Sequence, residues 1–158
     1  MIKNDMLVQL LKLEQLTPTL ETMRDNGVII RRAQPWEISA VREFVVKEFT
    51  VGWADEISVG YCRQPVSVFI AIREGKVIGF AGYECTRRSY FGPTGVAANE
   101  RKKGIGKALL LAALHGLRDM GYVYGIIGSA EVPDFYAGAV SAIEIVNSVP
   151  GVYVDKLL

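Results

Sequence analysis

The chain has 158 residues, 50% of them hydrophobic and 22% charged, which is the composition of one globular domain rather than of a disordered or fibrous protein. Eighteen basic residues against seventeen acidic ones leave a formal net charge of +1, so no overall field favours nucleic acid or an anionic membrane. The longest uninterrupted apolar stretch, residues 108–114, is far shorter than the roughly 20 residues that span a bilayer.

The N-terminal sequence lacks the apolar block and the small-residue cleavage site of a signal peptide, so we expect a cytoplasmic protein. Cys62 and Cys85 form no CxxC pair and are expected to be free thiols. The lone histidine, His115, and the two isolated cysteines make a metal site improbable, so no metal is expected.

In the first third of the chain the apolar spacing predicts mainly helices. Leu7, Leu10 and Leu11 have helical spacing, and a second short helix is expected from Thr17-Pro18 to Asn26-Gly27. Residues 28–32, VIIRR, predict a first strand. Pro35 opens an amphipathic helix that runs to Phe49, and residues 50–65 show no sustained period and predict a loop or a short helix.

The rest of the chain alternates strands with helices. Residues 66–72 and 77–85 predict a hairpin around the turn REGK, and residues 90–98 a strand interrupted by glycine and proline. A buried helix is expected over 106–120 and a strand over 122–130. A short helix from Pro133 and a last strand, GVYVDKLL, complete an α+β or mixed α/β domain.

The stretch from Arg101 to Lys107, RKKGIGK, combines bare backbone with positive charge where the 106–120 helix begins. A helix start exposes unpaired N–H groups and a partial positive charge, and both attract anions. Gly104 and Gly106 have no Cβ to hold a phosphate oxygen away from the backbone. The stretch therefore predicts a pyrophosphate cradle, against the alternative of a solvated basic turn.

Spacing excludes two other phosphate motifs. A Walker A loop would need glycine at 101 and Ser or Thr at 108, where the chain has Arg101 and Ala108. A dinucleotide-binding fingerprint would need glycine or alanine at 109, where the chain has Leu109, and it normally lies near the start of a βαβ unit.

Arg101-Lys102-Lys103-Gly104-Ile105-Gly106, after a broken strand and before an apolar helix, resembles the coenzyme A motif Q/R-x-x-G-x-G/A of the GNAT superfamily of N-acetyltransferases. The order of elements is similar from about residue 28 to the C-terminus. The resemblance implies a mixed, mostly antiparallel sheet flanked by helices. It divides the chain into an N-terminal helical extension, 1–26, and an acetyltransferase domain, 27–158.

The resemblance implies acetyl-CoA as cosubstrate. Its pyrophosphate would be held by the backbone of residues 101–106, and its pantetheine arm would pair with the strand end at Val96 and Ala97. Lys102, Lys103 and Lys107 would add contacts to the phosphates. The implied reaction moves an acetyl group from the thioester to a primary amine by direct attack.

For the chemistry, Tyr136 matches the tyrosine that relatives place near the coenzyme sulfur. Many relatives carry a glutamate base on the strand before the loop, but residues 90–98 contain no carboxylate. Glu84 on the preceding strand is the candidate base, with Asp55 and Glu56 as alternatives that would act directly or through water.

Trp53, Asp55, Glu56 and Tyr61 fall where relatives gather the acceptor, and the acidic pair would suit a cationic amine. The chain departs from the family after Tyr136, where AGAVSAIEIVNSVPGVYV replaces the usual Gly-Phe element. The acceptor could be a small molecule or a peptide, and the resemblance makes a homodimer a reasonable expectation.

Two other functions remain open at this point. A non-catalytic acyl-CoA sensor would keep the cradle without turnover, and the missing strand carboxylate favours it. A nucleic-acid module is disfavoured, because one short cationic cluster on a nearly neutral chain makes a poor phosphate-tracking surface.

Overall fold

The computed structural model describes residues 1–157, and within them seven strands form one mixed sheet in the order β2-β3-β4-β5-β6-β1-β7. The strands are β1 (Met6–Gln9), β2 (Ile29–Arg32), β3 (Val68–Arg73), β4 (Lys76–Tyr83), β5 (Tyr90–Val96), β6 (Tyr124–Ile127) and β7 (Ile143–Glu144). The α-helices are α1 (Leu16–Asp25), α2 (Ile38–Glu48), α3 (Val51–Ser58), α4 (Ile105–Asp119) and α5 (Pro133–Val140). The mixed sheet with flanking helices confirms the expected fold class.

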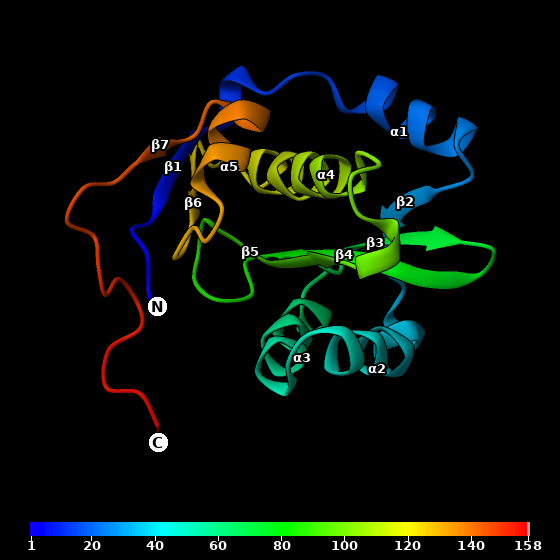
Figure 1. Ribbon diagram of the computed structural model, residues 1–158, viewed down its shortest axis with the longest axis horizontal. Helices are drawn as coiled ribbons and strands as arrows, with labels where there is room; N and C mark the ends of the chain where they lie inside the picture. Colours follow the sequence, from blue (N-terminus) through cyan, green and yellow to red (C-terminus); the bar gives the residue numbers. More distant parts are fainter. Residues whose placement is uncertain (158) are drawn as a thin grey trace.

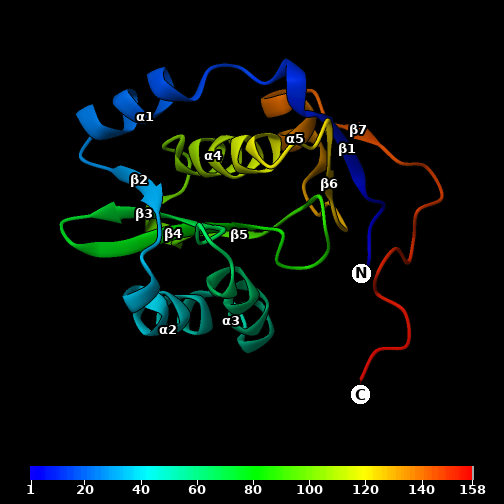
Figure 2. The same cartoon turned by 180° about the vertical axis from the view of Figure 1, so that it is seen from behind.

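The helices cover the sheet in two layers. Helices α1 and α4 lie on one face with α5 at their end, and α2 and α3 lie on the opposite face (Figures 1 and 2). Each layer has its own apolar core, one around α4 and one around Val45, Ile57, Ile70 and Phe80. The sheet therefore separates two helical layers, each with its own apolar core.

Helix α4 is buried almost all round. The side chains of residues 108–114 are at most 1% exposed, because the sheet packs on one side and α1 with the preceding segment on the other. An apolar surface on every side is typical of a helix at the centre of a core. His115 on this helix lies with its Nε2 2.8 Å from the carbonyl oxygen of Glu14, which fixes the N-terminal segment to α4.

The helix expected around Leu7–Leu11 is wrong, because Met6–Gln9 form β1. Met6, Val8 and Leu10 are buried while Gln9 is exposed, an alternation with the period of a strand. β1 pairs antiparallel with β6 and also with β7. Hydrogen bonding along the β6 edge thus outweighs the helical spacing of the leucines, and residues 6–9 join the sheet.

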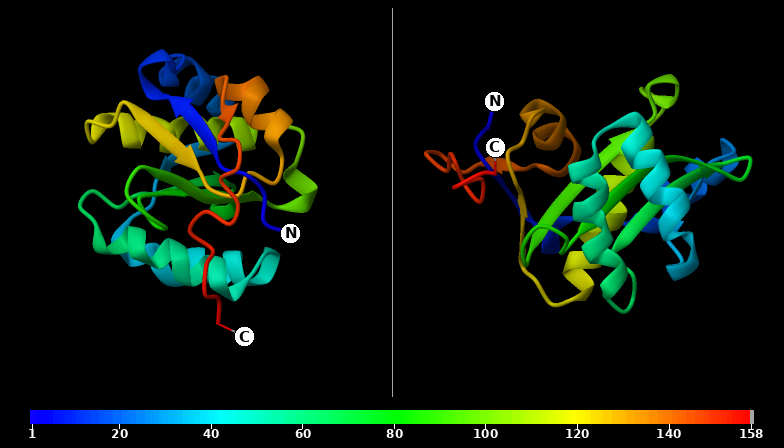
Figure 3. Two further views of the ribbon diagram at one scale, coloured as in Figure 1. Left: turned by 90° about the vertical axis from the view of Figure 1, so that its left-hand side faces the viewer. Right: turned by 90° about the horizontal axis from the view of Figure 1, so that it is seen from below.

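The last strand expected from residue 151 is also wrong within the described residues. Gly151 and Val152 lie in a turn, and the N–H of Tyr153 bonds to the carbonyl of Pro150. The segment after β7 is instead fastened to the N-terminus: Ile145 N–H donates to Asp5 O, and Asp5 N–H donates to Ser148 Oγ, both at 2.8 Å. Figure 3 shows this tail beside the N-terminus, running past the sheet toward the α2–α3 layer. Leu158 lies outside the described residues.

Candidate active site

Strands β5 and β6 separate soon after they meet. They are parallel and paired only at Tyr90–Ile126 and Phe91–Ile127, and no pairing between them follows within residues 1–157. On its other edge β5 stays paired with β4 up to Val96. The β6-facing edge of residues 92–96 is therefore left without a strand neighbour.

The backbone of Val96 points into this opening. Ala97 N–H donates to Ile78 O at 2.9 Å on the β4 side, and neighbouring residues of a strand direct their backbone groups to opposite edges. The Val96 carbonyl accepts a hydrogen bond from Nε of Arg101 at 3.1 Å. Of the two strand-end residues expected to pair with pantetheine, Val96 has its backbone on the open edge and Ala97 does not.

The glycine loop follows directly and leads into α4. Gly104 precedes the helix with φ +82, a left-handed conformation that glycine adopts without a steric penalty, and no side chain caps the helix. The first N–H groups of α4 are thus available to an anion. A β-carbon on Gly106 would point toward Val96 Cγ2 and Phe135 Cζ, 3.8 and 3.9 Å away, so the bare backbone keeps this space free.

The basic residues of the loop differ in their partners. Lys103 Nζ lies 3.0 Å from Glu100, which also accepts two bonds from Arg73, and Lys107 Nζ lies 2.8 Å from Glu14. The bonds from Arg73 and then Lys103 lower the pKa of Glu100. Lys102 has no carboxylate within ion-pair distance among residues 1–157. Arg101 also has no carboxylate partner there but donates to the Val96 carbonyl, so Lys102 is the loop cation whose side chain has no partner among the described residues.

Tyr136 lies on α5, close to the point where β5 and β6 diverge. Its side chain is 7% exposed, and its ring packs edge-on against Phe91 and Phe135 with centroid distances of 6.2 and 5.3 Å. Burial, with a smaller contribution from Glu131, raises the pKa of Tyr136 to about 12. The phenol therefore keeps its proton at physiological pH and can act as a hydrogen-bond donor.

Glu84 is buried, at 2% exposure, in the turn that joins β4 to β5. Its carboxylate accepts the N–H of Ser89, and its Oε2 lies 3.9 Å from Nη1 of Arg63. A bond to Glu84 also contributes, after burial, to a raised pKa of Tyr122. These contacts make Glu84 a structural element of the 84–89 turn, and none of them joins it to Tyr136.

On the α2–α3 side, an aromatic cluster packs against β5. The rings of Phe49 and Trp53 stack at 5.4 Å, and both contact Phe80 edge-on. Gly95 faces this cluster, and a β-carbon there would overlap the Phe49 ring. Sequence reasoning found Trp53 but missed Phe49 and Phe80, whose periodicity indicated only core positions.

The other expected acceptor residues point in different directions. Asp55 is exposed and pairs with Arg42 at 3.0 Å, while Glu56 accepts a hydrogen bond from the hydroxyl of Thr86. Tyr61 has a buried hydroxyl without a partner among residues 1–157, and burial followed by Glu37 raises its pKa. The structure thus brings Trp53 to the β5 side of the site and does not gather all four residues around one point.

The family model described as the acetyltransferase (GNAT) family matches residues 33–139. The chain belongs to this family. It is accordingly an acyltransferase.

Solved structures share the GNAT fold at low sequence identity. A GCN5-related glucosamine N-acetyltransferase region of a fungal multi-domain GH3 β-N-acetylglucosaminidase superposes with a TM-score of 0.72 at 18% identity, over 91% of this chain and 20% of that one. A GCN5-related N-acetyltransferase from Sphaerobacter thermophilus gives 0.67 at 18% identity, over 91% and 49%. A GNAT acetyltransferase from Colwellia psychrerythraea gives 0.63 at 14% identity, over 92% and 53%.

The chain thus spans about half or less of the length of these structures. No curated protein matches its sequence. Within residues 1–157, no three His, Cys, Asp or Glu side chains gather as they would around a metal ion. No helix in the same range is long and apolar enough to cross a membrane.

Proposed function

We propose that this GNAT enzyme transfers an acetyl group from acetyl-CoA to a primary amine by direct attack in the opening between β5 and β6. The observation that carries the proposal is the unpaired edge of β5 leading into the uncapped start of α4. An extended ligand can add its hydrogen bonds to such an edge, and its phosphates can bind at the helix start.

The chain's groups fit acetyl-CoA, which supplies an acetyl group activated as a thioester. The backbone of Arg101–Gly106 would hold the pyrophosphate, with Lys102 as the unpaired cation beside it. Val96 offers its N–H and carbonyl to the pantetheine amides after Arg101 releases the carbonyl. Lys103 and Lys107 would contribute a weaker attraction, because Glu100 and Glu14 already neutralise them.

The acceptor amine has to lose a proton before it attacks. An alkylammonium with a pKa of about 10.4 is neutral in about one molecule in 2,500 at pH 7, which corresponds to about 4.6 kcal/mol. Glu84 stays the candidate base of this proposal, acting through water, since residues 90–98 offer no carboxylate. Because its carboxylate accepts the backbone N–H of Ser89 in the 84–89 turn, the stability of Glu84→Gln should be measured by urea unfolding before any kinetic effect is assigned to base catalysis.

Tyr136 is the proposed donor to the departing thiolate. Its phenol keeps its proton because its pKa is raised to about 12, and its ring contacts Phe91 at the start of the opening. A phenol less acidic than the thiol does not transfer its proton easily, so the role is a hydrogen bond to the developing negative charge.

The charges around the tail favour a cationic acceptor. Burial raises the pKa of Tyr153, and Glu56, Asp5 and Glu131 add to this effect, so three acidic groups act on one region beside the sheet. Trp53 and Tyr61, which pack against the same apolar cluster, and the carboxylates of Asp55 and Glu56 are the proposed contacts of a small or peptide amine. A cytoplasmic location fits the two free cysteines, and a homodimer is the proposed assembly.

The proposal is tested by incubating the protein with acetyl-CoA and a panel of amines and measuring the release of free coenzyme A thiol. For each amine, the alcohol with the same carbon skeleton is tested as the control. The panel includes glucosamine, since a fungal protein of the same fold is described as a glucosamine N-acetyltransferase region. We expect thiol release with at least one amine and none with its alcohol. Binding of acetyl-CoA with no turnover across the panel would instead favour an acyl-CoA sensor.

A further inference from the structure

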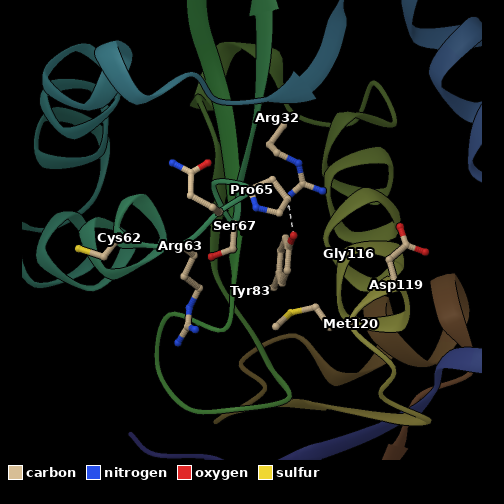
Figure 4. Close-up of a pocket in the computed structure, with 10 residues that line it drawn as sticks. Arg32, Cys62, Arg63, Pro65, Ser67, Tyr83, Gly116, Asp119 and Met120 are labelled. Carbon is tan, nitrogen blue, oxygen red and sulfur yellow. Dashed lines mark hydrogen bonds between the residues drawn. The ribbon is translucent and has the colours of Figure 1, made fainter.

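A second cavity lies at the far end of α4 from the glycine loop. It has a volume of about 310 Å³ and is lined by Arg32 and Tyr83 from the strands, by Gly116 and Asp119 from α4, and by residues 62–65 and Ser67 of the segment before β3 (Figure 4). Gly116 lies 11 residues after Ile105, the first residue of α4, so the cavity begins about 17 Å from the glycine loop at 1.5 Å per residue. It is therefore distinct from the proposed acetyl-CoA site.

Arg32 is the charged group at the centre of this cavity. Its Nη1 donates to the carbonyl of Val66 at 2.7 Å and to the hydroxyl of Tyr83, and its guanidinium lies 4.7 Å from the centroid of the Phe69 ring. No carboxylate of residues 1–157 lies within ion-pair distance, and its Nε and Nη2 make no hydrogen bond there. A half-buried guanidinium held in one orientation without a counter-ion is prepared for an anion.

A neighbouring hydroxyl supplies a further donor. The Tyr83 ring reaches Arg32 only because Gly116 faces it: a β-carbon at residue 116 would lie 2.5 to 2.9 Å from Cζ, Cε1 and the hydroxyl of Tyr83. A glycine inside a helix lowers helix stability by about 1 kcal/mol relative to alanine, so the close approach of Tyr83 to α4 comes with a loss of helix stability. Ser67 also lines the cavity, but it is 1% exposed and its hydroxyl lies toward Gly60 and Cys85, so the Tyr83 hydroxyl is the further donor.

The second charged residue near the cavity is already engaged. Arg63 bonds to the carbonyl of Glu84 through Nε at 3.0 Å and lies 3.9 Å from its carboxylate. One free cation suits a single carboxylate better than a doubly charged phosphate. The negative end of α4 and the carboxylate of Asp119 border the same space, which disfavours a dianion and favours a positive group on that side.

We propose that this cavity binds a small zwitterionic amino acid. Its carboxylate pairs with the free nitrogens of Arg32, with the hydroxyl of Tyr83 as a further donor, and its ammonium faces Asp119 and the C-terminal end of α4. The apolar surfaces of Pro65 and Met120 leave room for a short side chain.

Calorimetry and thermal unfolding of the whole chain with the twenty L-amino acids, with their des-amino carboxylates and with inorganic phosphate test the proposal in the absence of acetyl-CoA. At least one amino acid should bind and raise Tm by mass action, more strongly than its des-amino carboxylate and than phosphate. No binding by any amino acid, or stronger binding of phosphate, would overturn the proposal.

Substitutions of the lining residues test which side chains contact the bound amino acid. Arg32→Met should weaken binding at least tenfold, whereas Arg118→Met, which removes an equal charge from the exposed side of α4, should not. Asp119→Asn should weaken binding of the amino acid but not binding of its des-amino analogue. Tyr83→Phe keeps the ring against Gly116, removes the hydroxyl beside Arg32 and should reduce affinity. If Arg32→Met does not fold, unchanged affinity in both Asp119→Asn and Tyr83→Phe contradicts the assignment.

Discussion

Gly95 of β5 packs directly against the ring of Phe49 at the end of α2, so that a β-carbon on Gly95 would overlap three ring atoms. Phe49 in turn stacks on Trp53, and both rings contact Phe80 of β4. Because Gly95 has no side chain, the aromatic cluster can lie against the face of β5, the strand whose β6-facing edge is open.

Gly95→Ala should destabilise the fold by about 1 to 3 kcal/mol, the usual cost of forcing extra volume into a packed site. Replacing Phe49 by leucine in the same chain should recover part of this loss, because the smaller side chain makes room. Urea unfolding of the two single variants and the double variant gives the coupling free energy. Strictly additive effects would show that the two residues do not press on each other.

Gly106→Val should abolish most acetyl-CoA affinity while the chain still folds. The new side chain would extend toward Val96 and Phe135, into the space beside the start of α4. Gly138→Val on α5 is the matched control, since a β-carbon there meets no atom within 4 Å. Calorimetry should give an acetyl-CoA affinity for Gly106→Val at least tenfold lower than for Gly138→Val. Equal affinities would remove the loop from the binding site.

Tyr136→Phe should preserve folding and acetyl-CoA affinity and lower turnover. The ring contacts to Phe91 and Phe135 persist, and only the hydroxyl is lost. A hydrogen bond to developing charge is worth about 2 to 4 kcal/mol, which predicts a fall of roughly 30- to 1,000-fold in kcat. Tyr124→Phe, which alters an exposed tyrosine, is the control. Parent-level turnover with the chemical step rate-limiting would make Tyr136 a core residue only.

The stability of the fold should decrease above about pH 9 because of Cys85, and more steeply above about pH 10, where Tyr136 also contributes. Burial raises the pKa of Tyr136 and of Cys85 to about 12, so both keep their protons in the folded state at a pH where the unfolded chain loses them. Stability from raised pKa values is complete below the unfolded pKa and is lost as pH rises toward 12.

For Tyr136 this loss amounts to at most about 3 kcal/mol, at about 1.4 kcal/mol per pKa unit. Urea midpoints at pH 8, 10 and 11 measure it. In Tyr136→Phe the urea midpoint should fall less between pH 8 and 11 than in the parent protein, whereas in Tyr124→Phe it should fall as much as in the parent. Midpoints that stay constant up to pH 11 in the parent protein would refute the burial argument.

The glycine loop could be predicted from the sequence because its chemistry is local. A helix start, two glycines and four cations lie within seven residues, and the structure places Gly104 and Gly106 at the first turn of α4. The hairpin of β3 and β4 was predictable for the same reason, since its turn lies between two apolar runs.

Contacts between distant segments were not predictable in this way. The spacing of Leu7 and Leu10 fits a helix, and only the free edge of β6, more than a hundred residues later, makes residues 6–9 a strand. The carboxylate of Asp5, which accepts the N–H of Ser129 at 2.8 Å, carries no local signal of that contact. Arg32 and Gly116 likewise meet around Tyr83 only after the sheet and α4 have packed.

Hydrogen exchange with and without acetyl-CoA tests the central claim most directly, because it reports which backbone amides the ligand covers and needs no acceptor. The account predicts slower exchange at the amides of Thr94 and Val96 and at the first residues of α4, with little change in β2 or α2. ATP at the same concentration should protect these amides much less. Protection confined to other segments, or equal protection by ATP, would contradict an acetyl-CoA site in the opening between β5 and β6.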